Sequence, residues 1–221
     1  MRWFQLWLNL PAKSKMVEPN QMMHWAESIS RFNSADGKVY ARVLAGNFHG
    51  VQALTPIKDS WAKDLKNDVN IWYIIMKPGA TIKLPKSMAG SNRTLYFVEG
   101  TGLTLDKTTK IPDSSMVEFK DHSTNEIELE NTGTEKDLEI LVLQGKPIGE
   151  PVAQHGPFVM NTREEIMQAF SDYRKTQFGG WPWPKDAMVF PREKGRFLSV
   201  KGKPEEYPPP KKEEEEKKDE L

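Results

Sequence analysis

The sequence predicts an all-β fold of two packed sheets, followed by one amphipathic helix and a charged tail. Short apolar segments separated by turn residues recur between residues 39 and 143. A helical repeat of apolar residues occurs at 162–175, and from Lys201 onward Pro, Lys and Glu dominate. About ten short strands in about 110 residues are typical of a jelly roll or of a sandwich, and strand spacing alone does not distinguish the two.

The predicted strands show either alternation of apolar and polar residues or a short continuous apolar run. They are 39–44, 46–54, 69–76, 81–84, 93–99, 103–105, 115–119, 127–130 and 138–143. Turn residues separate them, as at Lys77-Pro78-Gly79, Gly100-Thr101-Gly102 and Asn131-Thr132-Gly133. This series places the chain in the all-β class.

The first ten residues, MRWFQLWLNL, fit a β-strand better than a secretory signal. Apolar residues at positions 4, 6, 8 and 10 fall on one face of an extended chain. A signal peptide is the alternative, but Gln5 and Asn9 interrupt the apolar run and no small-residue cleavage site follows. Prolines at both ends of 11–19 then predict an extended connector.

One helix is predicted to begin after Thr162. Asn161 and Thr162 can cap it, and Glu165 stands three residues after Thr162, which is the spacing of a capping box. Apolar residues at 166, 169, 170 and 173 form one stripe, and Gly179-Gly180 is expected to end the helix. The stripe is expected to pack on the outside of the β domain, with a partner-binding surface as the alternative.

Composition excludes several classes of protein. The 221 residues include 31 basic and 31 acidic side chains, so charge gives no reason to expect direct binding of nucleic acid. The absence of cysteine excludes disulfides, zinc–cysteine sites and a thiol nucleophile. No segment approaches the roughly 20 apolar residues of a membrane span. The sequence also contains no phosphate-binding loop, dinucleotide motif or nucleophile elbow.

The four histidines, His24, His49, His122 and His155, do not form a metal motif. A non-haem iron site needs at least two His and a carboxylate on one face, and no His-x-His pair occurs that a strand could present together. His24 and His122 are expected on the surface. His155 is expected to hydrogen-bond the backbone of its loop, with a catalytic base as the alternative. We therefore expect no catalytic residue and no metal or cofactor site in this chain.

Three stretches resemble the pirin family, whose members consist of two cupin barrels. They are GEPVAQHGPFVMNT at 149–162, FGGWPWP at 178–184 and LWLNLPAKSKM at 6–16. The motif residues, for which we expect structural roles, are His155, Gly156, Pro157, Phe158, Asn161, Trp181 and Trp183. The two Trp lie between prolines and are expected to anchor an extended clasp, or else to form an aromatic ligand site. The resemblance selects a cupin jelly-roll barrel over a sandwich.

The resemblance implies that the chain begins near the end of a first barrel. The implied parts are the last strand and linker of that barrel at 1–18, a second barrel at 19–149, a capped helix and clasp at 150–200, and a disordered tail at 201–221. In pirins the first barrel holds iron through three His and one Glu, and the second barrel is metal-free. Where a metal-binding cupin has its first motif, Thr81 and Lys83 or their neighbours replace the histidines.

The implied function is that of a second-barrel module without a metal site of its own, with a structural or protein-interaction role. Intact pirins resemble quercetin 2,3-dioxygenase and act as transcription cofactors. The alternative is therefore part of an iron-dependent dioxygenase whose metal-binding barrel lies upstream, and a third hypothesis is a metal-free binder of small molecules. We also expect a protein partner or self-association at the surface where two barrels normally pack, with an unpaired N-terminal strand at its edge.

The last four residues, Lys218, Asp219, Glu220 and Leu221, spell KDEL, a retrieval signal of the endoplasmic reticulum. The Lys- and Glu-rich sequence before them would keep the signal exposed. Retrieval acts only on proteins that have entered the secretory pathway. We therefore expect the lumen of the endoplasmic reticulum if a signal peptide lies upstream, and the cytoplasm or nucleus otherwise.

Overall fold

The computed structural model describes residues 3–119, 126–200 and 202–210, and it divides the chain into two compact units. The barrel unit contains the described residues up to Leu10 together with Ile29–Ile148. The helix unit contains Pro11–Ser28 and the described residues from Gly149 onward. Within the described ranges, no helix is both long and apolar enough to cross a membrane.

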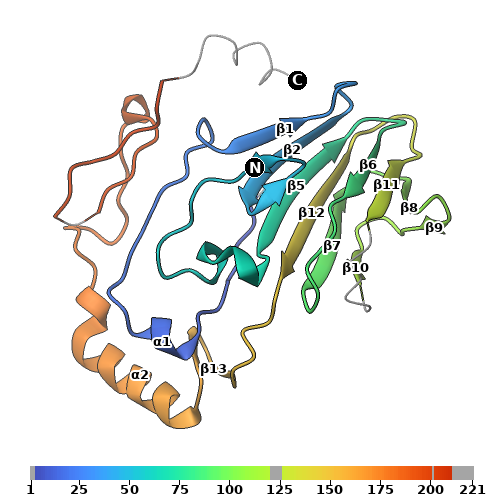
Figure 1. Cartoon of the computed structure of the whole chain (residues 1–221). Coiled ribbons are helices and arrows are strands. Elements are labelled where there is room, and N and C mark those ends of the chain that lie inside the picture. Colours follow the sequence, from blue (N-terminus) through green and yellow to red (C-terminus); the bar gives the residue numbers. More distant parts are fainter. Residues whose placement is uncertain (1–2, 120–125, 201, 211–221) are drawn as a thin grey trace. The chain divides into compact units, whose positions relative to one another are not determined.

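The barrel unit is built around two main antiparallel sheets, which agrees with the predicted all-β jelly roll (Figure 1). The larger sheet has the strand order β1 (Ser30–Asn33), β2 (Val39–Ala45), β5 (Asn70–Met76), β12 (Leu138–Gly145), β7 (Asn92–Glu99) and β10 (Met116–Glu118). The smaller sheet has the order β6 (Thr81–Leu84), β11 (Ile127–Asn131), β8 (Leu103–Leu105) and β9 (Thr109–Lys110). Two 3₁₀ turns, η1 (Trp61–Lys63) and η2 (Leu65–Asn67), precede β5.

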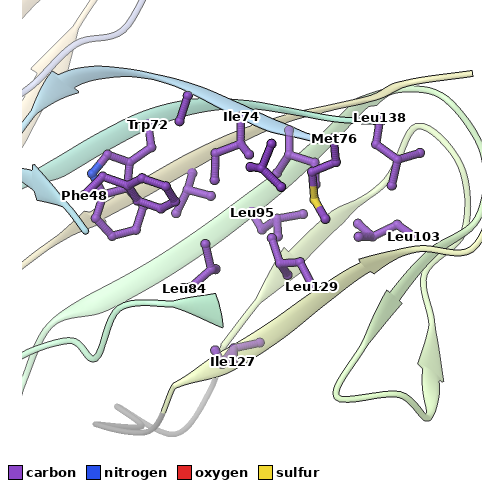
Figure 2. Packing of buried hydrophobic residues seen from close by; sticks show 14 of the residues in the cluster. Phe48, Trp72, Ile74, Met76, Leu84, Leu95, Leu103, Ile127, Leu129 and Leu138 are labelled. Atoms are coloured by element: carbon purple, nitrogen blue, oxygen red, sulfur yellow. The ribbon is translucent and has the colours of Figure 1, made fainter. Parts of the chain in front are cut away.

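One core fills the space between these sheets (Figure 2). Strand β5 shows why: its residues alternate between buried and partly exposed, so that Trp72, Ile74 and Met76 all point inward. Because side chains alternate across a strand, every second residue of this largely apolar strand faces the core. The smaller sheet supplies Leu84 and Leu129 to the same cluster.

All nine predicted strands have a counterpart in the structure, but 46–54 is a hairpin and not one strand. It consists of β3 (Asn47–Phe48) and β4 (Val51–Gln52). His49 and Gly50 turn the chain between them with φ values of +47° and +86°. Strands β1 and β9 were not predicted, because β1 carries Phe32 as its one apolar residue and β9 has only two residues.

The N-terminal strand prediction is wrong, since residues 3–10 adopt neither helix nor strand. Their alternation instead serves side-chain packing: the ring of Phe4 lies 6.0 Å from that of Tyr73 on β5. The prediction of an extended connector at 11–19 is also incorrect at its start. The helix α1 (Ala12–Lys15) begins directly after Pro11, whose φ of −65° suits a helix N-terminus.

The predicted helix is α2 (Arg163–Thr176), and its capping box is present. The Glu165 amide donates to Thr162 Oγ1 over 3.2 Å, and Glu165 Oε2 accepts from the Thr162 amide over 2.9 Å. The helix ends before the predicted Gly179-Gly180, because Gln177 adopts a left-handed conformation with φ of +50°. A 3₁₀ turn, η3 (Gln177–Gly179), follows.

The apolar stripe of α2 packs on a hairpin within the helix unit, where the sequence predicted packing on the barrel. The hairpin consists of β13 (Ala153–His155) and β14 (Phe158–Met160). The ring of Phe158 lies 4.8 Å from Phe170 and 6.0 Å from Tyr173, both in edge-to-face geometry. The hairpin was not predicted because its strands have only three residues each.

The described tail is tied to preceding residues, whereas the sequence predicted disorder from 201. After the 3₁₀ turn η4 (Arg192–Lys194), Leu198 and Glu206 form an antiparallel bridge. Lys194 Nζ lies 3.9 Å from the centre of the Phe197 ring and 2.7 Å from Glu205 Oε1. The hydrogen bond from Lys194 is the largest of the effects that lower the pKa of Glu205. Ring and charge contacts therefore order residues 202–210.

We predict that Leu129→Ala lowers the free energy of unfolding by about 2 to 5 kcal/mol, because Leu129 is fully buried between the sheets. Urea unfolding followed by tryptophan fluorescence measures this. Leu65→Ala is the matched control, since Leu65 is exposed and its truncation should change stability by less than about 0.5 kcal/mol. Equal losses in the two variants would contradict the core assignment.

Candidate functional site

The interior of the barrel unit is mostly apolar. The inward faces of β5 and β7 present Trp72, Ile74, Leu95 and Phe97, all buried. Among the described residues, no three His, Asp or Glu side chains come close enough together to hold a metal ion. The donor set that hard cations or iron require is therefore not assembled within the described part of the chain.

Strand β6 contains the residues that sequence analysis placed at the first cupin motif. Thr81 and Lys83 are exposed, whereas Ile82 packs against the core and Leu84 is fully buried. Lys83 Nζ lies 3.6 Å from Glu126 Oε2 on the outside of the sheet. Apolar side chains thus occupy the inward positions of this strand. Lys83 is exposed, so repulsion of a cation by its ammonium group is not the reason that the strand lacks metal ligands.

The described histidines have different local contacts. His49 Nε2 lies 2.8 Å from the carbonyl oxygen of Lys83, and its ring packs on Phe48. His24, predicted to be exposed, is half-buried, and its Nε2 lies 3.1 Å from Met22 Sδ. His122 lies outside the described residues.

A buried polar cluster lies in the barrel unit and was not predicted. Asp68 Oδ2 accepts hydrogen bonds from the Met88 amide, Ser91 Oγ and Gln144 Nε2 over 2.7 to 2.8 Å. Gln144 Oε1 in turn accepts from Arg93 Nε over 2.6 Å. Each of these polar side chains needs a hydrogen-bond partner, because an unpaired buried polar group destabilises the fold. The partners are separated by 20 to 76 residues in sequence, so no local motif could reveal the cluster.

Arg93 is 3% exposed, so its positive charge is almost completely removed from water. Removal from water lowers the pKa of the Arg93 guanidinium, and the charge of Asp68 opposes this change. Its Nη2 donates to the carbonyl oxygen of Pro85. This end of the barrel unit therefore holds a cation inside an otherwise apolar interior.

A groove of about 430 Å³ lies on the barrel unit between residues 5–8 and the larger sheet. Ile71, Thr94 and Leu143 line it from three neighbouring strands. Trp61 also lines it and donates from Nε1 to the carbonyl oxygen of Lys146 over 2.9 Å. The segment that covers this sheet face is itself only partly buried, with Trp3 66% and Trp7 64% exposed.

The motif QHGPF forms the tip of the β13–β14 hairpin in the helix unit. His155 and Phe158 pair across it, so Gly156 and Pro157 form a two-residue turn, and Gly156 has the positive φ of +56° that such turns require. The ring of His155 lies edge-on at 5.3 Å from Phe170. This edge-to-face contact joins the tip of the hairpin to α2.

Asn161 joins the segment before the hairpin to the start of α2. Its Nδ2 donates to Glu150 Oε2 and to the carbonyl oxygen of Pro151, both over 3.0 Å. Its backbone amide donates to Glu165 Oε2 over 2.8 Å. A depression of about 730 Å³ beside these groups is lined by His155, Asn161 and Arg163, among others. Arg163 was not singled out from the sequence because it belongs to no motif.

The Trp-Pro-Trp-Pro segment has no regular structure, as the sequence predicts. Trp183 is half-buried, but Trp181 is 59% exposed and donates from Nε1 to the carbonyl oxygen of Lys185 over 2.7 Å. The Trp181 indole thus closes a local turn and buries little surface. The KDEL residues lie outside the described residues.

Comparison with known proteins agrees with this architecture. Residues 71–179 match the pirin C-terminal cupin domain. This chain carries a pirin C-terminal domain. A “Pirin-like protein” of Caulobacter vibrioides is 35% identical over 178 residues, which are 80% of this chain and 59% of that protein. A Pseudomonas aeruginosa protein named “Putative quercetin 2,3-dioxygenase” is 35% identical over 176 residues, covering 79% of this chain and 58% of that protein.

A solved structure shares the fold of this pirin domain. The crystal structure of quercetin 2,3-dioxygenase from Acinetobacter baumannii superimposes with a TM-score of 0.65 at 26% identity. The match covers 77% of this chain and 55% of that chain. The pirin-like chain thus spans between half and two thirds of the length of the relatives that it matches.

We predict that Gln144→Ala lowers the free energy of unfolding by about 1 to 3 kcal/mol, because both Arg93 Nε and Asp68 Oδ2 lose a buried partner. Urea titration measures the loss. Gln154→Ala provides the control, since Gln154 is exposed in the helix unit. A loss below about 0.5 kcal/mol in Gln144→Ala would show that the cluster does not stabilise the barrel unit.

Proposed function

We propose that the barrel unit is the metal-free module of a two-barrel pirin and has a structural and protein-interaction role. The observation that carries this proposal is the apolar interior, in which Trp72, Leu84 and Phe97 occupy inward positions. An interior filled by side chains that cannot coordinate a metal supports a barrel that acts through its shape and its outer surface. The family match supports the cupin module itself.

The groove beside residues 5–8 supports the larger sheet face as the interaction surface. Exposed large apolar side chains gather in the N-terminal segment, among them Trp3, Leu6, Trp7 and Leu8. Apolar surface of this kind on one side of a domain marks sites of protein association. We infer that its occupant is a second cupin barrel, since the relatives that match this chain are substantially longer.

A second candidate function is a share in a quercetin 2,3-dioxygenase reaction. It is favoured by the solved Acinetobacter baumannii structure, which carries that name and superimposes on most of this chain. Iron would then be held by donors of the other barrel, because this barrel presents apolar side chains where ligands would stand. In that case the present barrel would position its neighbour and would not touch the substrate.

The KDEL sequence supports a proposal on location. We infer that a chain delivered to the secretory pathway is retrieved to the endoplasmic reticulum through Lys218–Leu221. The acidic and basic residues that precede the signal favour its exposure to a receptor.

We predict that the purified chain contains less than about 0.1 iron atom per molecule after expression with added iron, because its barrel lacks the donor set of a non-haem site. Inductively coupled plasma mass spectrometry measures the metal, and quercetin consumption measures the activity. The Pseudomonas aeruginosa relative, purified in parallel, is the positive control. Stoichiometric iron together with quercetin turnover by this chain alone would contradict both candidates, because each leaves the present barrel without metal ligands.

We predict that the chain self-associates and that Trp3→Ser/Trp7→Ser reduces the association at least about tenfold, because these exposed indoles flank the proposed interface. Sedimentation velocity over a concentration series measures the equilibrium. Leu65→Ser is the matched control, since it removes an equally exposed apolar residue elsewhere on the barrel unit. A monomeric wild-type chain would contradict the proposal that these exposed indoles belong to an association surface.

We predict that a signal-peptide fusion of the chain stays inside cells and that deletion of Lys218–Leu221 releases it into the medium, because retrieval receptors read the terminal tetrapeptide. Immunoblotting of cells and medium measures the distribution. The control replaces Leu221 with Val-Leu, which displaces the motif and leaves the charge unchanged. Equal retention of all three chains would show that KDEL has no function here.

A further inference from the structure

A sequence pattern for covalent modification lies at the start of β7. Asn92-Arg93-Thr94 reads Asn-x-Thr with a residue other than proline in the middle, which is the acceptor pattern of N-linked glycosylation. No other Asn in the sequence is followed two positions later by Ser or Thr. Three residues are a short motif, so the place of these side chains in the fold decides whether the pattern is usable.

The fold places the amide and the hydroxyl of the pattern on one outer surface. Residues two apart in an extended strand point to the same side of the sheet. Asn92 and Thr94 accordingly both line the groove of about 430 Å³ beside residues 5–8, whereas Arg93 between them is buried. Strand β7 lies between β12 and β10 in the larger sheet (Figure 1). Both groups that a glycosyltransferase recognises therefore face the proposed association surface.

The folded barrel unit has room for a sugar at Asn92. This residue is exposed and is the first of β7, directly after a turn in which the Ser91 amide donates to the carbonyl oxygen of Met88 over 3.1 Å. Its cross-strand partner on β12 is Gly145, which has no side chain. Because directly opposite side chains are the closest neighbours on a sheet face, a glycan at Asn92 would displace none on β12.

We propose that Asn92 is N-glycosylated when the chain enters the lumen of the endoplasmic reticulum, and that the glycan then covers the association surface near residues 5–8. The inference rests on the proposed location and on the proposed interaction surface. The donor is an oligosaccharide linked to a polyprenyl diphosphate. A bond forms between Asn92 Nδ2 and the anomeric carbon of the sugar, the bond from that carbon to the diphosphate oxygen breaks, Nδ2 gives up one proton, and the lipid diphosphate leaves.

The glycan would control association because it is bulky and strongly hydrated. Ile71 and Leu143 line the same groove as Asn92, so a second barrel that docks there must remove this apolar surface from water. A sugar bonded to Asn92 stands in the groove and keeps the second barrel away. The unmodified chain keeps the face open. The compartment in which the chain resides thus decides whether this surface is available to a partner.

Expression of the full chain behind a cleavable signal peptide in cultured animal cells tests the modification. We expect one slower-migrating band on denaturing gels, which peptide N-glycosidase F converts to the unmodified mobility. Asn92→Gln and Thr94→Ala remove the acceptor amide and the hydroxyl separately, and each should lose the slower band. Asn20→Gln is the matched control and should keep it, because Asn20 is also exposed but is followed two residues later by Met22.

Entry into the lumen is measured independently of Asn92. Loss of the signal peptide, read from the mass of the deglycosylated chain, reports entry. In the Asn92→Gln background, Met22→Thr creates a new acceptor pattern at the exposed Asn20 and should restore one slower band. A wild-type chain that loses its signal peptide but carries no glycan would overturn the proposal. A slower band that persists in Asn92→Gln alone would overturn it as well, since the sugar would then lie elsewhere.

Sedimentation velocity tests whether the glycan covers the association surface. The glycosylated chain is compared with the same preparation after treatment with peptide N-glycosidase F, and bacterially expressed Asn92→Asp controls for the Asp that this enzyme leaves. We expect association of the treated chain and of Asn92→Asp, and loss of association in the glycosylated chain. Equal association of all three would refute the covering role. If none associates, the association surface and the covering role are both wrong, whereas the gels still decide the glycosylation.

Discussion

The apolar alternation of β5 is the constraint on which the barrel unit depends. This strand lies between β2 and β12 in the larger sheet, so it pairs on both edges, and its inward side chains reach the smaller sheet. Trp72, Ile74 and Met76 thereby fix how far apart the two sheets lie. Because close-packed interiors tolerate few voids, the same side chains also make the described centre of this barrel apolar.

The buried polar groups of the barrel unit consequently lie at one end of its interior. Hydrogen bonds there must offset the cost of removing these groups from water. Asp68 accepts three hydrogen bonds, and Gln144 passes the interaction on to Arg93 through both ends of its amide. Each member removed would leave another without a partner in low dielectric surroundings. A cation persists there because the hydrogen-bond network offsets part of the cost of its burial.

Sequence reasoning succeeded where the physical signal was local. The strands β5 and β12 follow from short apolar runs bounded by turn residues, and the start of α2 follows from the Thr162–Glu165 capping box. It failed at residues 3–10, where the alternation of apolar residues has two possible causes. The alternation there reflects packing of the segment on a sheet and not pairing as a strand within one. The cluster of Asp68 and Arg93 could not be predicted, because its partners meet only through the fold. Strand spacing also could not separate a jelly roll from a sandwich, and the motif resemblance made that choice.

When the interior of a cupin barrel is apolar, its interactions with other molecules take place at its outer surface. Inward residues such as Ile82 and Leu84 stabilise the barrel with buried area, but they cannot bind a metal ion or transfer a proton. The proposed recognition surface is then the outer sheet face near residues 5–8, where Ile71, Thr94 and Leu143 line a groove. This face suits another protein, since exposed apolar side chains such as Trp7 and Leu8 lie beside it. Association at this face would leave the packed interior closed.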